Sequence, residues 1–106
     1  MPNFNDMLSK AKEMQEKMKE AQEMIKKIEV EGKSGGDLVS VVLTGNYEIK
    51  SITISDEAKK EEQEIIIDLI KAAYNNAKEN LKRKSTEELS KITGGMNLPF
   101  DFKLPF

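Results

Sequence analysis

The first part of the chain carries apolar side chains in alternating steps of three and four residues. The apolar positions are Phe4, Met7, Ala11, Met14, Met18, Ala21, Ile25 and Ile28. A stripe of this width is typical of an α-helix that packs along one other helix. We therefore predict a long helix over residues 4–28, with Asn5 or Asp6 as its N-cap. The stripe packs either within the chain or against a second copy, and its candidate dimer contacts are Met7, Met14, Met18 and Ile25.

The next segment changes to a pattern that is typical of strands. Residues 38–44 are rich in β-branched side chains and follow a glycine-rich stretch, 32–37, which we interpret as a β-turn because it leads into a strand. Gly45-Asn46 fits a two-residue hairpin turn before a further strand over residues 47–55. The apolar phase shifts within that strand, which predicts a bulge or burial on both faces. With a short strand around residues 28–31, the sequence predicts a three-stranded antiparallel sheet.

Residues 56–84 return to helical spacing, with Asp56 as a candidate N-cap. The apolar stripe of this segment is broad, as expected for a helix that covers a sheet. Ser85 and Glu88 have the spacing of a capping box, so we expect a break there and a short helix that runs to Ile92. The order of elements predicts an α+β fold with an α-β-β-β-α core.

The end of the chain has a different composition. Residues 94–106 hold two of the three prolines and three of the four phenylalanines, and Gly94-Gly95 ends the helix before them. We predict one domain over residues 1–93 and a Gly-, Pro- and Phe-rich tail over residues 94–106, which is either docked on the body or held for a protein partner. The candidate contacts of the tail are Leu98, Phe100, Phe102 and Phe106.

Three missing residue types limit the chemistry of the chain. It contains no histidine, cysteine or tryptophan, which excludes a Ser-His triad, a thiolate nucleophile, a disulfide and a zinc knuckle. We expect no enzymatic activity, no cofactor, no metal and no small-molecule substrate. Apolar runs are too short to span a membrane, and the first residues do not resemble a signal peptide, so we expect a cytoplasmic protein.

The net charge of −2 comes from 17 basic and 19 acidic residues, and these are sorted along the chain. Lysines flank the apolar stripe of the first helix, acids lie opposite it, and residues 77–93 carry five basic against three acidic residues, or +2. The helix surface is either a solvated face with ion pairs between neighbouring turns or an edge that follows phosphates. The candidate DNA contacts are Lys10, Lys12, Lys17, Lys19, Lys26, Lys78, Lys82, Arg83 and Lys84.

Taken together, these parts resemble the YbaB/EbfC family of bacterial nucleoid-associated proteins. The resemblance covers essentially the whole chain, and its most specific pieces are the Gln15–Met18 run, the Gly94-Gly95-Met96 break and the Pro-Phe ending. It implies an α-β-β-β-α core, a tight homodimer, a place in the nucleoid, no catalysis and binding of double-stranded DNA with loose sequence preference. The low net charge predicts weak or dimer-dependent binding. The alternative is a protein-interaction module whose aromatic tail serves replication or recombination assemblies.

Overall fold

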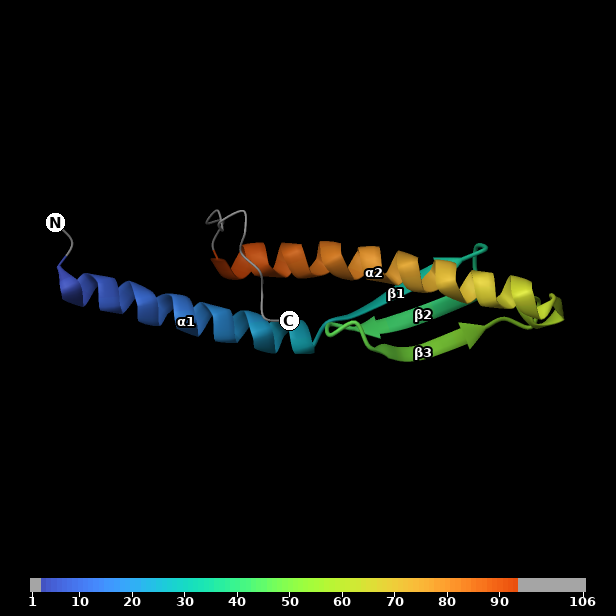
Figure 1. Ribbon diagram of the computed structural model, residues 1–106, viewed down its shortest axis with the longest axis horizontal. Helices are drawn as coiled ribbons and strands as arrows, with labels where there is room; N and C mark the ends of the chain where they lie inside the picture. Colours follow the sequence, from blue (N-terminus) through green and yellow to red (C-terminus); the bar gives the residue numbers. More distant parts are fainter. Residues whose placement is uncertain (1–2, 94–106) are drawn as a thin grey trace.

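Figure 1 shows the computed structural model of the chain, which describes residues 3–93. Its elements are α1 (Phe4–Lys26), β1 (Glu29–Ser34), β2 (Val39–Thr44), β3 (Ile49–Ile54), the 3-10 turn η1 (Ala58–Lys60) and α2 (Gln63–Thr93). This order confirms the predicted α+β fold and its α-β-β-β-α arrangement. The predicted tail lies outside the described residues, with its candidate contacts Leu98, Phe100, Phe102 and Phe106, and its division from the domain stays a prediction.

The three strands form one antiparallel sheet in the order β1-β2-β3. Side chains alternate between the two faces of a strand, and the fully buried side chains of the centre strand are Val39, Val41 and Leu43. They form one core with Ala73, Ala77 and Leu81 of α2 and with Ile25 of α1. The predicted bulge is confirmed, because the pairing shifts between Val42 and Leu43. The core therefore lies between the sheet and α2.

Two close approaches fix how the helices meet the sheet. Helix α2 crosses β1 over Gly32, where the backbone of Ala73 and Ala77 lies directly against the glycine. At the other end of the sheet, Gly45 lies against the backbone carbonyl of Ile25, the last buried residue of α1. A larger side chain at either glycine would meet backbone atoms, so both contacts depend on the missing Cβ.

The molecule is long and narrow, with extents of 69 × 22 × 18 Å. Helices α1 and α2 run in opposite directions, and Figure 1 shows the amino-terminal part of α1 continuing past the end of α2. In α1 only Ala21 and Ile25 are buried, whereas every residue over 3–16 is exposed. We call residues 4–16 the arm. The arm has no tertiary cover within the described residues.

Two predicted turns and caps were wrong in detail. Asn3, and not Asn5 or Asp6, caps α1, because its Oδ1 accepts the backbone N–H groups of Asn5 at 2.7 Å and Asp6 at 3.2 Å. The hairpin between β2 and β3 is longer than the predicted Gly45-Asn46 pair. It includes Tyr47, which adopts a left-handed φ of 63° and whose N–H donates to the Thr44 carbonyl at 3.0 Å.

Both predicted limits of the second helix were also wrong. The helix begins at Gln63 and not near Asp56, because Ser55 Oγ accepts the N–H of Ala58 at 3.1 Å and starts the short turn η1. No break occurs at Ser85. Thr86 Oγ1 donates to the Lys82 carbonyl within the helix at 2.9 Å, and the half-buried Leu89 and Ile92 continue the covered face.

Candidate nucleic-acid interface

The lysines of α1 form two rows along the helix. Lys12, Lys19 and Lys26 recur every seven residues on one side of the apolar stripe, while Lys10 and Lys17 lie on the other side. Four of the five are exposed; Lys17 is half-buried, and its ammonium lies 3.5 Å from a carboxylate oxygen of Glu13. Lys10, Lys12, Lys19 and Lys26 form no ion pair with another residue of 3–93. These four ammonium groups are available to an anionic ligand.

On α2 the structure brings together Lys78 and Lys82, which lie one helical turn apart on its exposed side. Lys71 extends the same row two turns earlier, since it precedes Lys78 by seven residues. None of the three forms an ion pair within the part of the chain that the structure describes. Lys71 was not among the candidate DNA contacts predicted from the sequence, although its spacing from Lys78 is a usable signal.

Arg83 and Lys84 point elsewhere. Both line a shallow hollow between α2 and the start of β1, together with Glu87. The ammonium of Lys84 also lies 3.9 Å from a carboxylate oxygen of Glu88. The four basic residues between positions 78 and 84 are therefore divided between an open row, Lys78 and Lys82, and a hollow of mixed charge, Arg83 and Lys84.

The candidate dimer contacts on the apolar stripe of α1 are divided in the same way. Ile25 is buried in the core of its own chain and Met18 is half-buried, whereas Met7 and Met14 are 60% and 39% exposed on the arm. The carboxy-terminal half of the stripe thus packs within the chain. Only its amino-terminal half is open to another segment or another molecule.

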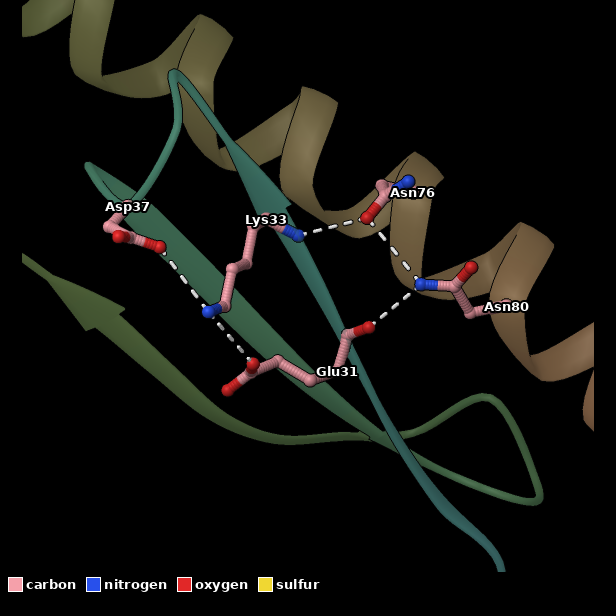
Figure 2. A network of polar contacts seen from close by, with 5 residues as sticks. All are labelled: Glu31, Lys33, Asp37, Asn76 and Asn80. Atoms are coloured by element: carbon pink, nitrogen blue, oxygen red, sulfur yellow. Dashed lines mark hydrogen bonds and ion pairs between the residues drawn. The ribbon is translucent and has the colours of Figure 1, made fainter.

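The face of the sheet away from α2 is occupied by ion pairs. Lys33 Nζ lies 3.3 Å from Asp37 Oδ1 and 3.5 Å from Glu31 Oε1 (Figure 2), and the Asp37 carboxylate, assisted by Glu31, raises the pKa of Lys33. Lys50 of β3 reaches across the sheet to Glu29 of β1. These lysines are already paired with acids, which makes this face a poorer phosphate site than the helices.

Figure 2 also shows how two asparagines of α2 cover the outer edge of β1. Asn76 Oδ1 accepts the backbone N–H of Lys33 at 3.0 Å, and Asn80 Nδ2 donates to the backbone carbonyl of Glu31 at 2.9 Å. An uncovered edge would present these groups to another strand. The asparagine pair therefore closes this edge, which no feature of the sequence had indicated.

The edge at β3 is open. Ser55 N–H donates to the Leu38 carbonyl at 2.9 Å, and because such bonds alternate along antiparallel strands, the backbone groups of Ile52 point away from β2. No residue within 3–93 bonds to those outward groups. Ile49 and Ile52 are also 49% and 43% exposed. This edge combines free backbone groups with uncovered apolar side chains.

Comparison with known proteins places the chain in one family. A sequence profile of the YbaB/EbfC DNA-binding family matches residues 1–96. The chain belongs to the YbaB/EbfC DNA-binding family. Nucleoid-associated proteins of Rickettsia felis and Rickettsia typhi are similar to it, at 47% and 46% identity over the full length of both chains.

A crystal structure also shares the fold. It is of an uncharacterized protein from Helicobacter pylori, and it matches with a TM-score of 0.70 at 21% sequence identity, covering 87% of this chain and 98% of that one. At this identity the likeness concerns the fold alone.

Membership of the YbaB/EbfC family confirms the resemblance drawn from the residues, and with it the expectation that the chain is not an enzyme. Across residues 3–93, no group of three or more His, Cys, Asp or Glu side chains could hold a metal ion. The described helices include none that is long and apolar enough to cross a membrane.

Proposed function

We propose that this member of the YbaB/EbfC family binds double-stranded DNA as a homodimer, mainly through backbone phosphates, and is associated with the bacterial nucleoid. The observation that supports this best is the set of exposed lysines on α1 (Lys10, Lys12, Lys19 and Lys26) and α2 (Lys71, Lys78 and Lys82) that have no ion-pair partner within residues 3–93. Lysine is a point charge that neutralises phosphate and releases counterions. The family description and the names of the relatives support the same proposal.

The composition of the rows favours loose sequence preference. Arg83 is the single arginine of the chain, whereas arginine makes the commonest specific contact to a base edge. Phosphate contacts position a protein on DNA without reading its sequence. Binding should therefore depend on salt more strongly than on base sequence.

The acidic residues limit the affinity of one chain. The chain has a net charge of −2, and α1 carries acids on the side opposite its apolar stripe. A single copy thus offers few phosphate contacts together with nearby repulsion. Two copies double the number of contacts, so binding should strengthen with dimerisation.

For the dimer we propose antiparallel pairing of β3 with β3 of a second copy. Free backbone groups at Ile52 and the exposed side chains of Ile49 and Ile52 support this edge. The opposite edge is covered by Asn76 and Asn80. Pairing through β3 would satisfy the backbone groups and bury the isoleucines of both copies in one step.

The test of DNA binding is a salt titration with two unrelated duplexes. We expect the logarithm of the binding constant to fall linearly with the logarithm of the salt concentration, by about 0.9 for each phosphate contacted. Lys78→Gln with Lys82→Gln should weaken binding equally on both duplexes and reduce that slope by about 2 per chain. Lys59→Gln with Lys60→Gln removes the same charge from η1 and should change little. No complex at micromolar protein in low salt would rule out the proposal.

The test of the interface is sedimentation of Ile52→Lys. A charge at this position should shift the protein to monomer, since it would be buried without a partner in the paired sheet. Ile65→Lys is the matched control, because Ile65 is 42% exposed but belongs to α2 and not to the β3 edge. A dimer that withstands Ile52→Lys would exclude β3 as the interface.

A further inference from the structure

The arm presents an apolar stripe that nothing in the described part of the chain covers. Phe4, Met7 and Leu8 are 74%, 60% and 46% exposed, and Met14 continues the stripe at 39%. The cover that α2 gives to α1 reaches only to Lys17 and Met18, which are half-buried. The apolar stripe of α1 does not stop there: it continues over the 13 residues of the arm, which α2 does not cover.

A helical arm of this length needs contacts to stay folded. Isolated helices shorter than about 12–15 residues are marginal in water, and most helical stability comes from packing of an apolar face. The sequence of the arm is a good helix former and its cap at Asn3 is formed. The exposed stripe is nevertheless the part of the arm that packing would stabilise.

A suitable segment follows directly from the place where the cover ends. Helix α2 ends at Thr93, close to the level of Lys17, because the two helices are antiparallel and Met24 and Glu88 line one hollow. The 13 residues after Thr93 belong to the tail. The chain therefore carries its own aromatic segment to the beginning of the uncovered stripe.

The pattern of that segment suits an extended conformation with one apolar side. Every second residue is apolar: Leu98, Phe100, Phe102, Leu104 and Phe106. The residues between them are Pro99, Asp101, Lys103 and Pro105. Alternation of this kind places all five apolar side chains on one side of an extended chain, and the prolines exclude a helix while restricting the unbound chain.

We propose that residues 98–106 lie extended along the arm of the same chain and cover the stripe from Met14 towards Phe4. The segment is long enough: the eight extended steps from Leu98 to Phe106 span about 27 Å, more than the ten helical steps from Met14 to Phe4, which span about 15 Å. Residues 94–97 provide the link, and Gly94-Gly95 allows the chain to turn. In this arrangement Leu98 lies nearest Met14, and Phe102 lies nearest Met7.

The same chain is favoured over a second copy because the link is short. A four-residue connection holds the segment at a high effective concentration over the arm, whereas a second copy must bind at its own concentration. The lysine rows flank the stripe and stay uncovered, so this docking goes beyond the proposed DNA binding and does not depend on it.

The first test is hydrogen exchange of the full chain without DNA. Phe100→Ser with Phe102→Ser should reduce the protection of arm amides by about tenfold or more, while β2 amides keep theirs and show that the body is folded. Asp101→Asn with Lys103→Gln alters the same segment on its polar side and should leave arm protection unchanged. Equal arm protection in all three proteins would overturn the proposal.

The second test uses the absence of cysteine from the chain. Met14→Cys with Leu98→Cys should form a disulfide in mild oxidant that runs as a single chain. Glu16→Cys with Leu98→Cys places the first thiol on the opposite side of α1 and should cross-link far more slowly. Equal rates for both pairs, or a product of two-chain size alone, would overturn the proposal, the latter in favour of a second copy. Neither result bears on DNA binding.

Discussion

Gly32 of β1 lies so close to Ala77 of α2 that a Cβ placed on the glycine would be 2.1 Å from the Ala77 backbone nitrogen. The same atom would be 2.3 Å from the carbonyl oxygen of Ala73. Both neighbours are backbone atoms of a helix, which cannot move aside as a flexible side chain can. The distance between α2 and the sheet therefore depends on this single missing methyl group.

Gly32→Ala should destabilise the fold by more than about 3 kcal/mol, because α2 must lift off the sheet to avoid the clash. Urea unfolding measures the change. Gly36→Ala is the control: Gly36 has a left-handed φ of 75° but no atom within 4 Å of its Cβ position, so it should cost only about 1 kcal/mol. Similar losses for both variants would show that the helix contact is less tight than described.

Asn76→Ala should expose the amide of Lys33 to exchange, because Asn76 Oδ1 is its acceptor at 3.0 Å. The stability lost with the hydrogen bond should be about 1 kcal/mol. Amide exchange followed by NMR measures the effect at the single residue. Asn75→Ala, one position earlier on the exposed side of α2, should leave the Lys33 amide protected.

Tyr47→Gly should stabilise the monomeric fold by up to about 1 kcal/mol, since Tyr47 has a φ of 63° that favours glycine. Thermal unfolding at low protein concentration measures it. Asn46→Gly, the neighbouring exposed turn position, provides the comparison and should not stabilise. A loss of stability in Tyr47→Gly would mean that contacts of the ring outweigh the backbone strain.

Removal of two positive charges from α2 should have different effects at different faces. Lys78→Gln with Lys82→Gln should weaken DNA binding more than Arg83→Gln with Lys84→Gln, because Lys84 already has an ion pair with Glu88 and both residues of the second pair line a hollow that also contains Glu87. Both double variants change the net charge equally. Fluorescence anisotropy at several salt concentrations measures the DNA affinity of both double variants. An equal loss of affinity would indicate that net charge alone governs binding.

The stability that the ion pairs of Lys33 contribute should be lost at high pH. Asp37 and Glu31 hold the pKa of Lys33 above its ordinary value of 10.5, so folding favours the protonated amine. This contribution is complete at neutral pH and is lost as pH rises through the raised pKa. The stability difference between the wild type and Lys33→Met should stay constant at pH 7–9 and shrink above about pH 10.5. A difference that changes near neutral pH would contradict this origin.

Much of the fold could be predicted from the sequence because periodicity reports burial. The helical stripe from Phe4, the β-branched run before Thr44 and the phase shift beside Lys50 all correspond to observed elements or to the bulge. Failures occurred where local signals compete with packing. Ser85 and Glu88 have capping-box spacing, but Leu89 lies on the covered face and the helix continues through it.

The candidate interface was less predictable. Basic residues that are close in sequence suggested one cluster. An α-helix has 3.6 residues per turn, however, so Lys82 lies in an open row whereas Lys84 lies beside Glu88. Asn76 and Asn80 carried no signal at all, because their role depends on where the edge of β1 lies in space. Side-chain pairing across elements is the information that a single sequence lacks.

The covered edge of β1 has a consequence for how far association can proceed. A sheet with two open edges can add copies indefinitely, which is the route to fibres. Here Asn76 and Asn80 occupy one edge, so a strand can be added only beside β3. If two copies pair through β3 as proposed, neither sheet edge described in residues 3–93 is left open to a third copy, and association stops at two chains.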